Sequence, residues 1–185
     1  MNRLVTVLRA ADAAARWHVG QRRKGAAQEP YVGHLLEVAR LVAEATAGAD
    51  PNLIVAALLH DTIEDQGVTR EEIAAKFGDD VAGLVVEVTD DKALPKAERK
   101  RLQIEHAPML TPRAKILKLA DKISNLRSLA TSPPAHWPMQ RRADYVVWTS
   151  KVVQGLRGAS GVLEQQFDQA AADAERAIPL AAERG

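Results

Sequence analysis

The spacing of apolar residues is the feature that most constrains the fold of this chain. Along nearly every segment they recur every three to four positions, as in residues 3–19 and 34–47. This period matches the α-helix, so it places the apolar side chains of each segment on one helical face. The two faces comprise Leu4, Val7, Leu8, Ala11 and Ala15, and then Leu35, Val38, Ala39 and Val42. The pattern predicts amphipathic helices rather than strands.

Residues 81–88 form the segment whose composition also fits a strand, because they are rich in valine. However, the apolar residues of this segment follow the helical spacing i, i+3, i+4, i+7. They are Val81, Leu84, Val85 and Val88. We therefore predict a helix here as well.

Start and stop signals divide the pattern into separate helices. Asp50 and Pro51 suit the N-cap and the first position of a helix. Residues 69–72 read as a capping box, and Gly78 suits the end of the helix that follows. The clearest loop is residues 132–134, Ser-Pro-Pro. Further helices are expected from Pro95 to about His106, from Thr111-Pro112 to Leu129, from about Pro138, and after Gly161.

The composition favours a single helical domain. The chain has 185 residues, 46% of them hydrophobic, which is enough for one domain with a substantial core. Aromatic residues make up only 4%, and this favours closely packed helices with small side chains. Hairpin signals, internal repeats and linkers are missing from the sequence. We therefore predict an all-α bundle of roughly eight to ten helices, in one domain over residues 1–185.

Charge and cysteine content exclude several classes of protein. The net charge is +1, so we expect neither nucleic acid nor a membrane surface as a partner. The chain has no cysteine, which excludes disulfides and zinc sites built on thiolates. It has neither a signal-peptide pattern nor a run of about 20 apolar residues. We therefore expect a cytoplasmic protein.

The hexapeptide His60-Asp61-Thr62-Ile63-Glu64-Asp65 directly follows the apolar run 53–59. One imidazole and three carboxylates at the end of a buried helix need a partner, and a metal ion can pair with several of them at once. Glu64 and Asp65 follow at one helical turn, so they can share a face with His60 or Asp61. One pair could bind a cation while the other transfers a proton.

Two further residues could complete a metal site. His34 begins one apolar helical segment, and Asp121 lies where another such segment becomes polar, with Asn125 one turn further along. Together with His60 and Asp61 they would give two imidazoles and two carboxylates. Such a set of nitrogen and oxygen ligands without sulfur suits manganese, iron or zinc.

The residues alone also allow structural interpretations. Residues 60–65 could be a helix end followed by a solvated acidic loop, His34 a helix-start residue, and Asp121 the partner of Lys118 or Lys122. Most of the charged residues in segment 96–101 are expected on a solvated helix face. Structural or surface positions are expected for three histidines: His18, His106 and His136. Positions in the core or in a pocket wall are expected for Trp17, Trp137 and Trp148.

Three motifs resemble the signatures of the HD-domain hydrolases of the RelA/SpoT type. They are Tyr31-Val32-Gly33-His34, the hexapeptide 60–65, and Leu119-Ala120-Asp121-Lys122-Ile123-Ser124-Asn125-Leu126. Segments 21–24 and 89–101 extend the similarity, which runs from about residue 5 to residue 160 and leaves a C-terminal helix in 161–185. It is closest to the small stand-alone members of the family, such as the metazoan SpoT homologue. We expect no synthetase segment, because the sequence ends at Gly185.

The resemblance implies an HD fold, a bound Mn²⁺, and hydrolysis of the 3′-diphosphate of guanosine tetra- or pentaphosphate (ppGpp or pppGpp). It implies Glu64 and Asp65 as the catalytic acidic pair. It also implies Arg23 packed on the guanine ring and Asn125 as a polar contact in the nucleotide pocket. The metal ligands that it implies are His34, His60, Asp61 and Asp121. The implied contacts to phosphates or sugar are Lys24, Lys96, Arg141 and Tyr145.

One position departs from the family pattern. Members usually have proline directly after the first histidine, and this chain has Leu35. Proline would pre-set the start of the helix, but leucine removes no ligand.

The sequence thus predicts a Mn²⁺-dependent (p)ppGpp 3′-pyrophosphohydrolase that yields GDP or GTP and pyrophosphate. One alternative is an HD phosphatase that removes a 2′- or 3′-phosphate from another purine nucleotide, such as NADPH. A second is an HD domain that binds a nucleotide without turnover. The presence of both Glu64 and Asp65 favours an enzyme, because binding alone does not need a pair that activates water.

Overall fold

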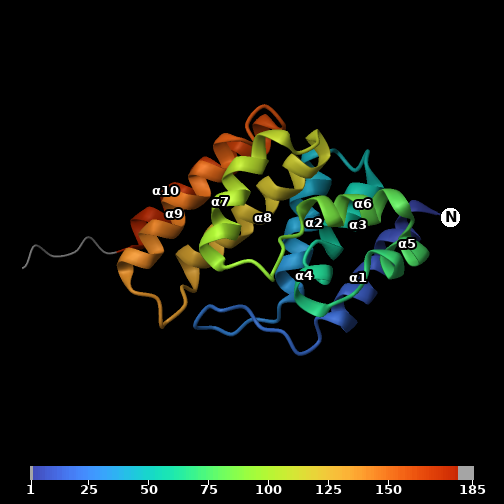
Figure 1. The fold of residues 1–185 in the computed structure, drawn as a ribbon, viewed down its shortest axis with the longest axis horizontal. Coiled ribbons are helices and arrows are strands. Elements are labelled where there is room, and N and C mark those ends of the chain that lie inside the picture. Colours follow the sequence, from blue (N-terminus) through green and yellow to red (C-terminus); the bar gives the residue numbers. More distant parts are fainter. Residues whose placement is uncertain (1, 179–185) are drawn as a thin grey trace, which may run out of the picture.

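The computed structural model describes residues 2–178, which contain ten α-helices and one 3₁₀ helix (Figure 1). Within these residues the only β pairing is an isolated antiparallel bridge between Arg22 and Pro30. The all-α prediction is therefore confirmed. In chain order the elements are α1 (Arg3–Trp17), α2 (Val32–Ala45), α3 (Pro51–Leu59), α4 (Thr62–Gln66), α5 (Arg70–Phe77), α6 (Asp79–Val88), α7 (Lys96–His106), η1 (Ala107–Met109), α8 (Pro112–Thr131), α9 (Met139–Gln154) and α10 (Gly161–Ala177).

The predicted helix boundaries rest on observed caps. The Asp50 side chain accepts a hydrogen bond from Leu53 N, and this contact begins α3. Thr69 and Glu72 form both hydrogen bonds of a capping box at the start of α5. Gly78 ends α5 with φ +93°, a conformation that favours glycine. Segment 81–88 is helical, as its spacing predicts, and lies in α6.

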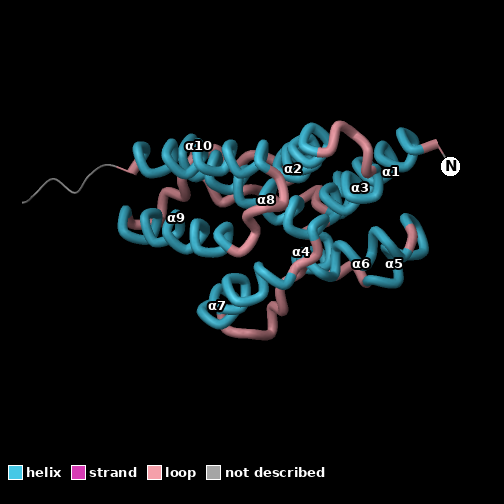
Figure 2. Tube along the Cα trace, turned by 90° about the horizontal axis from the view of Figure 1, so that it is seen from above, coloured by secondary structure: helices cyan, strands magenta, loops and turns pink. Residues whose placement is uncertain are grey.

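The long helix α8 is the centre of the molecule. It packs against α2, α3, α6, α9 and α10, and Figure 2 shows it running between the surrounding helices. Its apolar face is fully buried at Leu117, Leu119, Ile123 and Leu126, and burial of each such side chain stabilises the fold by roughly 1.5–3 kcal/mol. Among residues 2–178, no helix combines the length and the apolar character needed to span a membrane.

The hexapeptide is divided between two helices. α3 ends at Leu59, and α4 begins at Thr62 and is only five residues long. His60 is the C-cap of α3 and Asp61 is the N-cap of α4, so the chain changes direction between them. Gly67, with φ +67°, ends α4. After this break His60 faces Asp121 of α8, whereas Glu64 and Asp65 face Arg99 of α7 and the loop residues Gln21 and Lys92.

Two loops lie side by side at one end of α8 (Figure 1). One connects α1 to α2, and the other connects α8 to α9. The Ala27 amide donates to Ser132 Oγ at 3.0 Å. A Cβ at Gly25 would lie 2.2 Å from the carbonyl oxygen of Ser132, so only glycine allows the two loops to approach this closely.

The C-terminal helix predicted for residues 161–185 is observed as α10 up to Ala177, and residues 179–185 of that prediction lie outside the described part of the chain. The three tryptophans are partly buried and pack against the core. His106 and His136 are exposed, whereas His18 is buried.

Candidate active site

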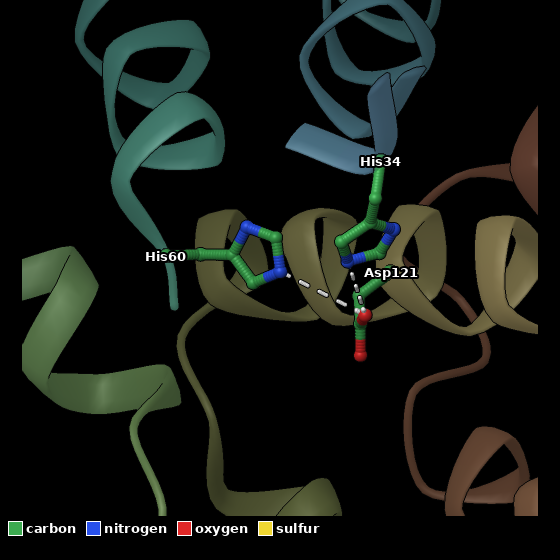
Figure 3. Close-up of side chains that lie close together, drawn as sticks. All are labelled: His34, His60 and Asp121. Carbon is green, nitrogen blue, oxygen red and sulfur yellow. Dashed lines mark ion pairs between the residues drawn. The ribbon is translucent and has the colours of Figure 1, made fainter. Parts of the chain in front are cut away.

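Three helices bring the predicted metal ligands together. His34 lies in the first turn of α2, His60 at the end of α3 and Asp121 in the middle of α8. Each of them offers one ligand atom, and these atoms lie within 4.8 Å of one another (Figure 3). Asp121 Oδ1 is 3.4 Å from His34 Nε2 and 3.7 Å from His60 Nε2. All three residues are buried.

Asp61, the fourth predicted ligand, borders this cluster. Its Oδ2 atom is 3.2 Å from His60 Nε2 and 3.6 Å from His34 Nε2. The same oxygen accepts a hydrogen bond of 2.5 Å from the hydroxyl of Tyr31. Tyr31 therefore fixes which carboxylate oxygen of Asp61 faces the two imidazoles.

The orientation of His60 fits a cation. Its Nδ1 donates to the carbonyl oxygen of Ala57 at 2.8 Å, which leaves Nε2 buried and without a hydrogen bond. An imidazole lone pair facing carboxylate oxygens needs a positive charge between them, either a proton or a metal ion. Burial lowers the pKa of His60, but Asp61 and Asp121 outweigh this effect and raise it to about 10.

The two carboxylates keep their negative charge inside the protein. Burial alone would raise the pKa of both, yet His60 and His34 hold the pKa of Asp61 well below its ordinary value. For Asp121 the Lys122 ammonium, 3.2 Å from Oδ2, is the largest of the effects that lower the pKa. The Asn125 amide also donates to Asp121 Oδ1 at 2.6 Å. The donor set therefore fits a divalent cation bound by two imidazole nitrogens and carboxylate oxygens.

The predicted acidic pair lies beside this cluster in two different environments. Asp65 accepts hydrogen bonds from Gln21 Nε2 at 2.7 Å and from the Lys92 ammonium. Glu64 has a looser partner, since Arg99 Nη1 is 3.6 Å from its Oε1. Burial, followed by the negative charges of Asp61, Asp90 and Asp65, raises the pKa of Glu64. A carboxylate with a raised pKa and a loose partner is suited to accept a proton.

A layer of polar side chains to which the sequence analysis assigned no role at the site supports these carboxylates. His18 Nδ1 lies 2.6 Å from Gln21 Oε1, and Gln66 Nε2 donates to the same oxygen at 2.5 Å. The ring of His18 stacks on Tyr31 with 5.4 Å between centroids. Gln21 and Tyr31 belong to segments quoted for the family resemblance, but nothing in their spacing assigned them these contacts.

Two adjoining cavities open at the site. The cavity over the proposed ligands and the acidic pair, here called the metal-side cavity, has about 300 Å³ and is lined by His60, Asp61, Glu64 and Asp121 among others. Five basic residues also line it: Lys24, Lys92, Arg99, Lys118 and Lys122. The second cavity, here called the aromatic cavity, has about 440 Å³ and contains Trp137 and Tyr145. The two share five lining residues, namely Lys24, Tyr31, Asp65, Lys92 and Asn125, and therefore lie next to each other.

The predicted substrate-binding residues lie around the aromatic cavity. Arg23 lines it and donates to Ser128 Oγ at 3.3 Å and to Asn125 Oδ1 at 3.2 Å, which fixes the plane of the guanidinium group. Lys24, Asn125 and Tyr145 also line it.

Lys96 and Arg141 do not line either cavity. Arg141 stacks on Trp137 with 4.4 Å between Cζ and the ring centroid. Burial and then the charges of Arg141 and Lys24 lower the pKa of Lys96. These residues therefore form a positively charged rim close to the mouth of the aromatic cavity.

A family model described as HD domain matches residues 10–163. The chain therefore belongs to the HD-domain family. The protein named guanosine-3′,5′-bis(diphosphate) 3′-pyrophosphohydrolase MESH1 from Xenopus tropicalis is 51% identical over 162 residues, which cover 88% of this chain and 90% of that protein. The human protein of the same name is 48% identical over 159 residues and covers 86% of this chain and 89% of its own length.

A solved structure points to the same branch of the HD-domain family. It belongs to work on a metazoan orthologue of SpoT that is described as hydrolysing ppGpp and acting in starvation responses. It matches with a TM-score of 0.87 and 43% identity, and covers 94% of this chain and 97% of that one. The resemblance of this HD domain to the SpoT type is thus confirmed. At the position where family members usually have proline, Leu35 is fully buried in the core. Helix α2 still begins two residues before His34.

Proposed function

We propose that the protein hydrolyses the 3′-diphosphate of ppGpp or pppGpp and releases pyrophosphate together with GDP or GTP. The relatives that match along most of their length carry the name of this activity. The observation that carries the proposal is the pairing of two adjoining cavities. One is lined by His60, Asp61 and Asp121 together with Glu64 and Asp65. The other offers Arg23 and aromatic side chains to a flat ring.

The two cavities suit the two ends of such a nucleotide. The guanidinium group of Arg23 presents a flat face on which a purine can stack. The five basic residues that line the metal-side cavity can neutralise the charges of a diphosphate group. The shared residues Lys24 and Asn125 lie where the ribose would connect the two ends.

We propose His34, His60, Asp61 and Asp121 as the residues that bind the metal, and Mn²⁺ as the ion. A divalent ion bound there would supply Lewis-acid chemistry, because it neutralises phosphoryl charge and lowers the pKa of water. The convergence of Nε2 atoms and carboxylate oxygens supports this assignment.

Glu64 and Asp65 have different roles in the proposed reaction. Hydrolysis breaks the bond between the ribose O3′ and its phosphorus, and the oxygen of a water molecule becomes part of the pyrophosphate. Glu64, with its raised pKa, accepts a proton from that water. Asp65, held by Gln21 and Lys92, orients the water, and the proton taken up by Glu64 passes to O3′ as the bond to phosphorus breaks.

The experiment is a substrate panel with metal analysis of the same purified protein. With Mn²⁺ and ppGpp we expect pyrophosphate and GDP in equal amounts, and with pppGpp we expect pyrophosphate and GTP. Folded, Mn²⁺-loaded protein that releases no pyrophosphate would contradict the proposal. Release of inorganic phosphate from NADPH in the same panel would favour the first alternative, and tight binding without product would favour the second. The cytoplasmic location and the single domain over residues 1–185 stay predictions.

A further inference from the structure

The side of His34 that faces away from the cluster makes a specific contact. Its Nδ1 atom lies 2.8 Å from Ser124 Oγ on α8. The His34 side chain is 1% exposed and Ser124 as a residue is also 1% exposed, so water does not compete for this hydrogen bond. His34 and Ser124 are 90 positions apart in the sequence, and their contact depends on the docking of α2 against α8.

The direction of this hydrogen bond follows from the next one. Ser124 Oγ also lies 2.7 Å from Glu37 Oε2, one turn along α2 from His34. An ionised carboxylate only accepts hydrogen bonds, so the single hydroxyl proton of Ser124 goes to Glu37. Ser124 Oγ must then accept from His34 Nδ1–H. The neutral imidazole therefore carries its proton on Nδ1 and keeps a lone pair on Nε2, the atom that faces Asp121 and Asp61.

Glu37 is held in its charged form from the opposite side. Arg127 Nη1 donates to Glu37 Oε1 at 2.9 Å, and Arg127 Nη2 donates to Gln166 Oε1 at 3.0 Å. Burial would raise the pKa of Glu37, but the hydrogen bonds from Ser124 and Arg127 outweigh it and lower this pKa. A continuous chain of hydrogen bonds thus runs from His34 on α2 through α8 to α10.

The two histidines of the cluster are fixed by different means. His60 donates its Nδ1 proton to the carbonyl oxygen of Ala57, within the last turn of its own helix. His34 has no such local partner and depends on side chains of another helix. A substitution that breaks the contact of His34 therefore leaves the orientation of His60 intact. This difference makes the role of the hydrogen bonds from Ser124 and Glu37 testable.

We propose that Ser124 and Glu37 are positioning residues for the metal site, because they fix the tautomer of His34 and strengthen its Nε2 as a ligand. Hydrogen bonds from a ligating histidine to an outer partner act in this way, and their loss typically weakens metal binding about 10- to 100-fold. This inference rests on the metal site of the proposed function and extends it to two residues that touch neither the ion nor the nucleotide.

The test compares Mn²⁺ affinities by following the electron paramagnetic resonance signal of free Mn²⁺ during titration. Ser124→Ala removes the acceptor of His34 Nδ1–H, and we expect the Kd to rise about 10- to 100-fold. Glu37→Gln keeps an oxygen that accepts from Ser124 but removes the charge, so its effect should be smaller. Ser124→Thr keeps the hydroxyl and should restore most of the affinity. The double variant should bind no more weakly than Ser124→Ala, because both changes interrupt the same chain.

Two matched controls separate this role from general effects of substitution. Ser150→Ala removes a hydroxyl that bonds only the backbone carbonyl of Val146, and Glu44→Gln removes an exposed ion pair with Arg40 on α2. Both should keep the affinity of the unmodified protein. A Kd for Ser124→Ala and Glu37→Gln within twofold of the unmodified value would overturn the proposal. If Ser124→Ala does not fold, Glu37→Gln and Ser124→Thr still provide the comparison.

The same samples distinguish a failure of this inference from a failure of the proposed function. Protein that binds Mn²⁺ but leaves ppGpp intact would contradict the proposed function alone. Weaker Mn²⁺ binding by the variants would still support the positioning role of Ser124 and Glu37. An unmodified protein that binds no Mn²⁺ would overturn the inference. Ring ¹⁵N spectra of the metal-free protein add a direct readout, since His34 should carry its proton on Nδ1 and Ser124→Ala should change this.

Discussion

Residues of one chemical type have different roles here because their surroundings differ. Asp61 and Asp121 face imidazoles and keep a pKa well below the ordinary value, which suits them to bind a cation. Glu64, three residues after Asp61, is half-buried among other carboxylates, and its pKa is raised. The hexapeptide thus contains both kinds of carboxylate, with Asp61 at the N-cap of α4 and Glu64 one turn further along the same helix.

This difference predicts the behaviour of Glu64→Gln. The amide keeps the shape of the side chain but cannot take a proton, so kcat for pyrophosphate release should fall by about 10²- to 10⁴-fold. Mn²⁺ binding should change little, because Glu64 is not in contact with the imidazoles. His60→Ala should instead lose both turnover and Mn²⁺. Steady-state kinetics with metal analysis distinguish the two, and Glu71→Gln on the exposed side of α5 is the control. Equal loss of metal in both variants would contradict the assignment of Glu64.

Arg23 allows a second prediction, on substrate binding. Arg23→Lys keeps the positive charge but loses the planar group that Ser128 and Asn125 hold in place. Loss of stacking worth about 1–2 kcal/mol should raise KM for ppGpp roughly 5- to 30-fold. The kcat and the Mn²⁺ affinity should stay near those of the unmodified protein. A fall in kcat with unchanged KM would place Arg23 in the chemical step instead of in binding.

Several contacts of single residues could not be predicted from the sequence. Tyr31, Gln21 and Lys92 hold Asp61 and Asp65, yet each is one polar residue in a loop or at a helix start. Polar side chains in loops have no periodic pattern, and their partners lie far away in sequence. The spacing of residues in the sequence also could not predict that His34, His60 and Asp121 converge. The family resemblance was needed to expect this.

At the scale of the elements, local signals were sufficient wherever a helix begins or ends on its own residues. Asp50, Thr69 and Gly78 cap or end helices at the predicted positions, because cap geometry depends on neighbours within a few residues. The sequence analysis missed α4 as a separate helix. A five-residue helix has too few positions to show a period, and the turn at His60 and Asp61 is fixed by contacts with α2 and α8.

The ion pairs of Arg113, here called the Arg113 clamp, connect three helices and predict that the stability of the fold depends on pH. Arg113, in the first turn of α8, forms ion pairs with Asp50 at the start of α3 and with Asp80 in α6. The hydrogen bonds from Arg113, and then from Asn52, lower the pKa of Asp80. Folding therefore favours the charged form of Asp80. Its contribution to stability is present above the ordinary Asp pKa of about 3.9 and is lost as the pH falls through the lowered value.

Asp80→Asn should accordingly reduce the free energy of unfolding at pH 7. The reduction should be smaller at about pH 3, below the ordinary Asp pKa of about 3.9, because the contribution of Asp80 decreases as the pH falls. The side chain is half exposed, so the difference should stay below about 1 kcal/mol. Urea unfolding at the two pH values measures it. Asp173→Asn, which removes an exposed ion pair within α10, is the control for loss of a surface charge. Equal destabilisation at both pH values would contradict an ionic role of the clamp.

At the scale of the whole molecule, the proposed metal site connects parts of the chain that are distant in sequence. His34, His60 and Asp121 come from α2, α3 and α8, and an ion that binds all three holds these helices together. The unfolded chain does not bring these ligands together, so binding should stabilise the folded state by mass action. Mn²⁺ at a free concentration of 100 times its Kd should add about 2.7 kcal/mol.

For a domain of this size, that increment should raise Tm by roughly 5–11 °C. Differential scanning calorimetry with Mn²⁺ and then with excess chelator measures it. His60→Ala should lose the increment, because its Nε2 is one of the buried ligand atoms, whereas Ser150→Ala should keep it. The variant also separates site binding from non-specific ion effects, since Mn²⁺ bound to surface carboxylates would shift the Tm of His60→Ala as well. An equal shift in both proteins would therefore contradict a site at the junction of α2, α3 and α8.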